Sequence, residues 1–360
     1  MLARRFLPWF FQAHHCWSVS PRAPRDTGVK PKLLIIELWG LGDLVIATPF
    51  IRAAAEKYDV TLLAKPFAAE MRQRLWPDVE VVSFNAPWTA FHFGSKYGVW
   101  RWPWPQMLRL RRELLSKNFD YGVSGRWDPR DHFLLKAVGA RERFGFPRLN
   151  SGRYLTQPLV RPDALAHRNE FWRTAGQALG LTLPSRHEIV PPAREPSPVA
   201  FIHSGARLPA RVWPLPHFQE LVSRLRQENI PAKIACDPDQ LSWWRQHGED
   251  VICPGNIAEL FQLVDRAGIF VGNCSGPGHL AAISGVPTFT LYGPSLHEWW
   301  APLHPAAEWI EGKACPYKPC SDYCRFSSPF CLWGITVEEA WPRIKQFAGS
   351  HLLRPKPLGT

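Results

Sequence analysis

The sequence predicts an α/β protein with a parallel sheet in each half of the chain. Strand-like and helix-like patterns alternate through both halves, which is typical of parallel sheets. Two segments, 33–52 and 268–294, each combine a short apolar run, a glycine-rich turn and a helical pattern. Helical spacing of apolar residues predicts helices at 44–57, 105–117, 168–180, 215–228, 257–266 and 336–347.

Length and composition indicate a globular protein of two domains. The 360 residues are enough for two cores, and 46% hydrophobic with 21% charged residues excludes a disordered chain. Residues 183–198, LPSRHEIVPPAREPSP, are rich in proline and charge, which is typical of a linker. We therefore expect a basic aromatic tail at 1–31, a domain at 32–182, the linker at 183–198, a second domain at 199–347 and a tail at 348–360.

The first strand–turn–helix segment begins with the apolar run 33–38, which is typical of a buried parallel strand. Gly40 and Gly42 follow, and we expect them to form a tight turn in backbone conformations that other residues resist. Asp43 then lies in the first turn of a helix, at the edge where open α/β sheets bind ligands. A carboxylate there can act as a base, or it can simply cap the helix.

The second segment, GIFVGNCSGPGHLAAISGVPTFTLYGP, repeats the same pattern. Ser275 and Gly276 are expected to present free backbone N–H groups at a helix N-terminus, which is a site for a diphosphate. His279 lies in the first turn, where it can contact the same anion or serve as a structural residue.

A third segment lies between the other two. Residues 201–206, FIHSGA, predict a strand and a turn of small residues that contains Gly205, and Arg207 and Arg211 follow. Guanidinium groups beside a strand end can bind phosphate through paired hydrogen bonds. Taken alone, the same residues would also fit an ordinary solvated loop.

Together these segments resemble the glycosyltransferase family that contains the ADP-heptose:lipopolysaccharide heptosyltransferases, glycosyltransferase family 9. The resemblance covers residues 32–347, and its motifs are GLGDLVIATPFIR, IHSGARLPARVWPLPHFQEL and VGNCSGPGHLAAISGVPTFTLYGPS. It implies two Rossmann-like domains facing across a cleft (the GT-B type). The acceptor would bind to the N-terminal domain and the nucleotide sugar to the C-terminal domain.

The resemblance also implies roles for single residues. Asp43 matches the catalytic base, and Gly40, Gly42 and Arg126 are expected on the acceptor side. The expected donor-binding residues are Gly205, Arg207, Arg211, Cys274, Ser275, Gly276 and His279. The implied reaction is inverting transfer of heptose or a related sugar from an ADP-heptose-like donor to lipopolysaccharide or another glycan. No metal or other cofactor is expected to be required, and His279, if protonated, would help to offset the diphosphate charge.

Two departures from the family pattern bear on the donor. Cys274 stands where the family usually has Asp, and Gln240 stands where Glu is common. Since a thiol accepts hydrogen bonds poorly, altered donor specificity and lost activity are both open. Two other functions fit the same cleft, namely a nucleotide-sugar epimerase or hydrolase and a non-catalytic glycan-binding protein.

The formal net charge of +12 indicates an anionic partner. No recognition motif for nucleic acid accompanies it, so we expect no nucleic-acid partner. Arg4 and Arg5 are flanked by aromatic residues in an apolar stretch too short to span a bilayer. We expect this tail to be either an interfacial anchor on an anionic membrane or disordered. The predicted location is therefore cytoplasmic, peripheral on the inner face of the membrane.

A second aromatic region, PWTAFHFGSKYGVWRWPWP, covers residues 87–105. Trp and Tyr favour the headgroup layer, where both an apolar ring and a polar edge are satisfied. The alternative is a lid that folds back on the N-terminal core. Either interpretation puts the loop on the acceptor side of the cleft.

Four cysteines cluster at Cys315, Cys320, Cys324 and Cys331, with four, three and six residues between them. Four thiolates can bind zinc, hold an iron–sulfur cluster or form two disulfides. The C-x₂-C pairs of a zinc ribbon are absent. We expect a structural role, with a bound metal as one option.

Overall fold

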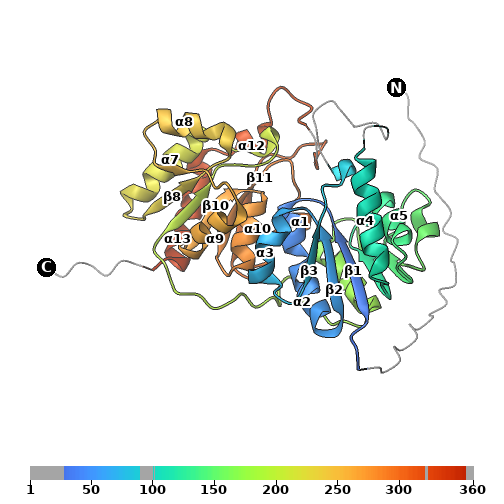
Figure 1. Ribbon diagram of the computed structural model, residues 1–360. Coiled ribbons are helices and arrows are strands. Elements are labelled where there is room, and N and C mark those ends of the chain that lie inside the picture. Colours follow the sequence, from blue (N-terminus) through green and yellow to red (C-terminus); the bar gives the residue numbers. More distant parts are fainter. Residues whose placement is uncertain (1–27, 90–99, 101, 321–322, 354–360) are drawn as a thin grey trace, which may run out of the picture.

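Two parallel sheets form the framework of the protein (Figure 1). The computed structural model describes residues 28–89, 100, 102–320 and 323–353. Within these residues the first six-stranded sheet has the order β3-β2-β1-β4-β5-β6 and the second the order β12-β11-β10-β7-β8-β9. Counted from its own first strand, each sheet has the strand order of a doubly wound Rossmann fold. The predicted α/β class with two Rossmann-like domains is confirmed.

The first sheet and its helices lie within residues 32–178. Its strands are β1 (Lys32–Glu37), β2 (Asp59–Ala64), β3 (Glu80–Ser83), β4 (Tyr121–Ser124), β5 (Glu142–Gly145) and β6 (Gln157–Pro158). Its α-helices are α1 (Leu41–Ile46), α2 (Thr48–Lys57), α3 (Phe67–Leu75), α4 (Trp104–Ser116), α5 (Pro129–Ala137) and α6 (Arg168–Ala178).

The second sheet and its helices lie within residues 200–351. Its strands are β7 (Ala200–His203), β8 (Ala232–Ala235), β9 (Val251–Ile252), β10 (Ile269–Asn273), β11 (Thr288–Tyr292) and β12 (Ala307–Glu311). Its α-helices are α7 (Leu215–Gln227), α8 (Leu241–Gln246), α9 (Ile257–Asp265), α10 (Gly276–Ile283), α11 (His297–Trp300), α12 (Phe330–Trp333) and α13 (Val337–His351).

The helices expected from the sequence lie within two residues of their predicted bounds except at two places. The helix expected at 44–57 is divided, because α1 ends at Ile46 and α2 begins at Thr48. Pro49 lies in the first turn of α2 and has no N–H to continue the hydrogen bonds of α1. The helix expected to end at 347 continues as α13 to His351. The proposed domain limits themselves stay predictions.

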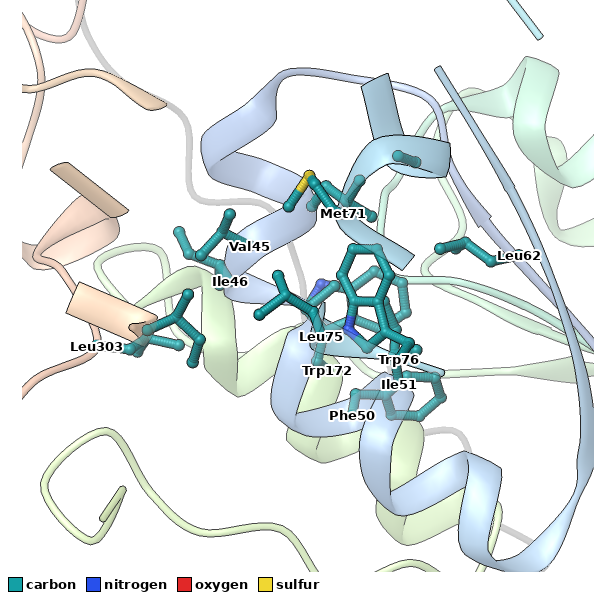
Figure 2. Close-up of a cluster of buried hydrophobic side chains, with 14 of the residues drawn as sticks. Val45, Ile46, Phe50, Ile51, Leu62, Met71, Leu75, Trp76, Trp172 and Leu303 are labelled. Carbon is teal, nitrogen blue, oxygen red and sulfur yellow. The ribbon is translucent and has the colours of Figure 1, made fainter. Parts of the chain in front are cut away.

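Apolar packing connects the two sheets. In Figure 2, Val45 and Ile46 of α1 and Phe50 of α2 lie in one buried cluster, and Leu303 approaches from the C-terminal domain. Leu280 of α10 belongs to the same cluster. The two domains therefore share buried apolar surface on the side of α1 and α10.

Polar contacts add to this connection beside the cluster. The guanidinium of Arg74 on α3 pairs with Asp265 on α9, with one N–O distance of 2.7 Å. The backbone N–H of Ile257 donates to Glu70 Oε2 at 2.8 Å. These contacts join α3 to α9 across the domain boundary.

The proline-rich segment 183–198 is fully described and contains no helix or strand. It is held mainly by Arg194, whose guanidinium donates to the carbonyl oxygens of Val264 at 2.8 Å and Ser284 at 3.2 Å. These bonds fix the end of the segment against the second domain.

The aromatic region at 87–105 is only partly described, and residues 1–27 lie outside the described part of the chain. Trp88 packs on Trp102 with ring centroids 5.5 Å apart, and its Nε1–H donates to Asp131 at 3.3 Å. Trp100 is 94% exposed and Trp104 is 43% exposed. Some of these indoles thus pack on the fold while others face solvent. Across the described residues, no helix combines the length and apolarity needed to cross a membrane.

Candidate functional site

Two glycine-containing turns face each other at the domain boundary. A Cβ on Gly42 would lie 2.7 Å from Cδ2 of His279, and a Cβ on Gly276 would lie 2.8 Å from Cβ of Leu41. Glycine at these two positions therefore lets the N-terminal ends of α1 and α10 approach each other closely. The expectation that Gly40 and Gly42 adopt unusual backbone conformations is wrong, because neither has a positive φ.

Asp43 makes two different interactions at the start of α1. Its Oδ2 accepts a hydrogen bond from the Gly40 N–H at 3.0 Å, which closes the first turn of the helix. Its Oδ1 is paired with the guanidinium of Arg126, and its side chain is 17% exposed. Asp43 is thus a helix cap and also a partly exposed carboxylate paired with a cation, so the two interpretations from the sequence are compatible.

Lys65 and Arg207 place positive charge near Asp43 from opposite domains. Lys65 follows β2, and burial together with the charge of Arg207 lowers the pKa of its ammonium to about 8. Burial and Arg211 lower the pKa of Arg207, while Asp43 raises it. The third segment, which carries Arg207 and Arg211, therefore lies within electrostatic reach of Asp43 in the first segment.

Arg168 lies at the first position of α6, among aromatic rings. Its guanidinium carbon is 4.2 Å from the ring centroid of Trp127, 4.6 Å from that of Trp299 and 5.1 Å from that of Trp300. Burial and the charge of Arg126 lower its pKa to about 9. Its buried Nε has no hydrogen-bond partner among the described residues. This arrangement holds a cation against indole faces beside Asp43.

Three polar atoms near the start of α10 are buried without a hydrogen-bond partner in the described part of the chain. They are Ser275 Oγ, Arg211 Nε and His279 Nδ1. Ser275 is the N-cap residue of α10 but its side chain does not cap the helix. Because buried polar groups are nearly always paired, three unpaired atoms at one helix N-terminus indicate a ligand site.

His279 is neutral at pH 7. Burial lowers the pKa of its imidazole to about 4, against a smaller opposite effect of Asp43. His279 was expected to offset the diphosphate charge only if protonated, and at pH 7 it is not. The positive charge at this site therefore comes from the arginines.

The third segment is held by buried polar contacts. Asn273 Nδ2 donates to the Ser204 carbonyl at 2.8 Å, and Asn273 Oδ1 accepts from the Trp213 N–H at 2.9 Å. A Cβ on Gly205 would lie 2.4 Å from the carboxyl carbon of Asp237. Gly205 is thus required for the approach of Asp237, and β7, β8 and β10 end at one common site.

The two departures from the family pattern differ in their surroundings. Cys274 is half-buried beside the helix N-terminus, where burial raises the pKa of its thiol and Arg211 partly opposes this. Gln240 is 5% exposed, accepts from Ser204 Oγ at 2.8 Å and donates to the Ser204 carbonyl at 3.2 Å. Cys274 therefore lies at the site, whereas Gln240 supports it from within the domain.

The clustered cysteines surround a cavity whose lining does not include Asp43. Cys315, Cys320, Cys324 and Cys331 line one small cavity, and none of the four forms a disulfide with another described cysteine. Burial, with Cys315 nearby, raises the pKa of Cys331 to about 11. Among the described residues, no three His, Cys, Asp or Glu side chains are arranged as ligands of a metal ion. The option of a bound metal stays a prediction.

Sequence reasoning missed Glu37, Lys65 and Arg168. Glu37 had a signal, since it is the charged residue inside the apolar run 33–38. Lys65 and Arg168 had none, because they are separated in sequence from every recognised motif. The fold brings them beside Asp43, as the electrostatic effects of Asp43 on both side chains indicate.

Residues 161–328 match the family model described as glycosyltransferase family 9 (heptosyltransferase). The chain resembles glycosyltransferase family 9. The resemblance inferred from the motifs is thus confirmed. Lipopolysaccharide heptosyltransferase 3 of Escherichia coli K12 is 27% identical over 119 residues, which is 28% of this chain and 32% of that protein. The match therefore spans about a third of the curated relative's length.

Solved structures support the fold over most of the chain. A family 9 glycosyltransferase of Veillonella parvula matches with a TM-score of 0.70 and 15% identity, covering 89% of this chain and 98% of that one. The E. coli heptosyltransferase WaaC, solved with ADP, matches with a TM-score of 0.67 and 16% identity, covering 88% of this chain and 99% of that one. At this identity the likeness establishes the two-domain GT-B fold.

Proposed function

We propose that this protein is an inverting glycosyltransferase that moves a heptose or related sugar from an ADP-heptose-like donor to lipopolysaccharide or a similar glycan. The observation that carries the proposal is the set of unpaired buried atoms of Ser275, Arg211 and His279 at the start of α10, which faces Asp43 on α1. A diphosphate would supply partners for Arg211 and Ser275 and accept hydrogen bonds from the α10 backbone. The relatives named as heptosyltransferases support the same reaction.

In this mechanism Asp43 Oδ1 accepts the proton of the acceptor hydroxyl. The hydroxyl oxygen forms a bond to the anomeric carbon from the face opposite the nucleotide. The bond from that carbon to the diphosphate oxygen breaks, and its electron pair leaves with the diphosphate. Arg211, Arg207 and the N–H groups of α10 stabilise the developing charge, while neutral His279 can donate or accept one hydrogen bond.

We place the acceptor on the N-terminal side of Asp43. Lys65, Arg126 and Arg168 supply positive charge there, and Trp39 and Trp300 flank the guanidinium of Arg126 at 5.2 and 5.9 Å. Indole faces and cations together suit a glycan that carries anionic groups. Gly42 does not open space on this side, because a Cβ there would lie 2.7 Å from Cδ2 of His279 in the second domain.

We also propose a cellular location for the protein and a role for its cysteine cluster. We place the enzyme in the cytoplasm, peripheral on the inner face of the membrane, where the exposed indoles of Trp100 and Trp104 would contact an anionic surface. We propose a structural role for the cysteine cluster; binding of a metal by its four thiolates would require their side chains to rearrange. One fold relative, TibC of E. coli, is itself described as iron-containing.

The proposal is tested by separating donor binding from turnover. Asp43→Asn should lower kcat by about 10²–10⁴-fold, the contribution of a positioned base, while ADP-heptose binds with unchanged affinity in calorimetry. Arg211→Ala should instead weaken binding of ADP, because it removes a cation from the diphosphate site. Asp59→Asn, an exposed carboxylate of the same domain, is the matched control and should leave both quantities unchanged.

Three outcomes would contradict the proposal. If Asp43→Asn lowered turnover only as far as it lowered the folded fraction, Asp43 would be a helix cap alone. Consumption of ADP-heptose at the full rate without any lipopolysaccharide acceptor would identify a hydrolase or epimerase instead. Absence of ADP binding would favour the non-catalytic glycan-binding alternative.

A further inference from the structure

Glu37 is a buried carboxyl group at the end of β1, and the reaction proposed above does not use it. The residue is 2% exposed. Its Oε1 accepts from the Trp39 N–H at 3.2 Å, and its Oε2 lies 3.6 Å from Nε of Arg126. Glu37 therefore contacts the same guanidinium that holds Asp43, but from the interior of the domain.

Arg126 is shared between the two carboxyl groups. One side of the guanidinium is paired with Asp43 Oδ1 and the other faces Glu37. The side chain is 15% exposed. Although burial opposes its charge, Asp43, Glu37 and Asp131 raise the pKa of Arg126, so it stays a cation. The one positive charge of Arg126 is thus close to two carboxyl groups, those of Asp43 and Glu37. Ionisation of either carboxyl group offsets part of that charge as felt by the other.

Charged groups from several elements change the pKa of Glu37. Burial and the negative charge of Asp43 raise the pKa of Glu37 to about 7, although Arg126, the Trp39 N–H and Lys65 act in the opposite direction. Glu37 in turn affects two further groups, Asp131 on α5 and Arg168 on α6. Glu37 therefore changes its charge in the neutral range of pH.

We propose that Glu37 is a positioning residue that adjusts the basicity of Asp43 through Arg126. When Glu37 is ionised it offsets part of the guanidinium charge, and Asp43 keeps more of its proton affinity. When Glu37 is protonated the whole charge of Arg126 acts on Asp43 and makes it a weaker base. This inference rests on the proposed role of Asp43 as the base that receives the acceptor proton.

The direct test is the pH dependence of kcat in the full chain, with ADP-heptose and lipopolysaccharide as substrates. The wild-type kcat should show a rise between about pH 6 and 8 as Glu37 ionises. Glu37→Gln keeps an oxygen for the Trp39 N–H but carries no charge. Its profile should lack this rise, with kcat about threefold to tenfold below wild type at pH 8 and an unchanged KM for ADP-heptose. An identical rise in wild type and Glu37→Gln would overturn the proposal.

A double-mutant cycle tests whether the effect passes through Arg126. In an Arg126→Gln background, Glu37→Gln should cause no further change in the pH profile, because the shared cation is gone. If Glu37→Gln changed kcat equally in both backgrounds, Glu37 would act without Arg126 and the proposal would fail.

Denaturation provides a readout that does not depend on activity. Since the folded-state pKa of Glu37 is raised, its contribution to stability is present at low pH and is lost as pH rises toward about 7. The urea midpoint of Glu37→Gln should therefore rise relative to wild type between pH 5 and 8. Glu80→Gln is the matched control in the same sheet. The hydrogen bond from Lys117 lowers the pKa of Glu80. Glu80→Gln should therefore lower the urea midpoint at pH 7 and have a smaller effect at low pH, where Glu80 is protonated.

The two failures can be told apart. Parallel pH–stability curves for wild type and Glu37→Gln would show that Glu37 does not titrate, and would overturn the inference while transfer activity remained. Absence of transfer by wild type would overturn the proposed function and the positioning role together, even if the denaturation curves still recorded the titration of Glu37.

Discussion

Replacing Gly42 with alanine tests how closely α1 and α10 must approach. The added Cβ would lie 2.7 Å from Cδ2 and 3.3 Å from Nε2 of His279, whose side chain is buried. Gly42 has no positive φ, so its backbone accepts alanine without strain. The substitution therefore isolates the contact between the two turns.

Two opposing effects set the expected magnitude. Alanine should stabilise helix α1 by about 0.8–1 kcal/mol relative to glycine. Overpacking against the His279 ring should cost about 1–3 kcal/mol, because the ring cannot move freely in a buried position. The net change in the free energy of unfolding is then a loss of about 0–2 kcal/mol. Turnover should fall more clearly than stability, because separation of α1 from α10 moves Asp43 away from the donor site.

Urea denaturation and steady-state kinetics measure the two effects. Gly349→Ala is the control, since a Cβ on this helical glycine of α13 would meet no atom within 4 Å. It should stabilise the protein by about 0.5–1 kcal/mol without changing kcat. In a His279→Ala background, Gly42→Ala should cause no further loss of stability, because the ring that its Cβ would meet is absent. If Gly42→Ala were as stabilising as Gly349→Ala and fully active, the close approach of the two turns would be refuted.

Three further predictions concern the donor, the cysteines and the membrane. Cys274→Asp should strengthen ADP-heptose binding in calorimetry by about 1.5–3 kcal/mol, the range for a hydrogen bond to a charged group, whereas weaker binding would exclude a heptose donor. If the cysteine cluster binds metal, mass spectrometry of the elements should find about one zinc or iron per chain in wild type and in Cys253→Ser but not in Cys320→Ser. An equal content in all three proteins would refute the site. Trp100→Ala should reduce co-sedimentation of the protein with anionic liposomes, and Val160→Ala is the control at an exposed apolar residue. Equal binding by the two variants would show that Trp100 does not contact the membrane.

Much of the framework could be predicted because its signals are local. A buried parallel strand has an apolar central run, as residues 33–36 of β1 and 269–271 of β10 do, and a glycine-rich turn before a helix marks the ligand edge of such a sheet. Asp43, Ser275 and Gly276 were identified in this way. The helices α3 and α5 were missed, because their sequences, FAAEMRQRL and PRDHFLLKA, mix charged and apolar residues without a long periodic pattern.

The protonation states and hydrogen-bond partners of the site residues depend on the tertiary structure. From the sequence His279 could be a cation, but burial makes it neutral. The sequence also indicated Gln240 as a change near the donor, whereas the Gln240 side chain is hydrogen-bonded to Ser204 inside the domain. Desolvation depends on which residues from other elements cover a group, and no local pattern records this.

The sequence by itself determined the two Rossmann-like units, the turn that carries Asp43 and the helix N-terminus opposite it. Only the tertiary structure decided that Glu37 and Arg126 lie behind Asp43, and that Gly42 is needed for contact with His279. The physical reason is that secondary structure follows from neighbours in sequence, whereas the charge and proton affinity of a site follow from groups that come together when strands and domains pack.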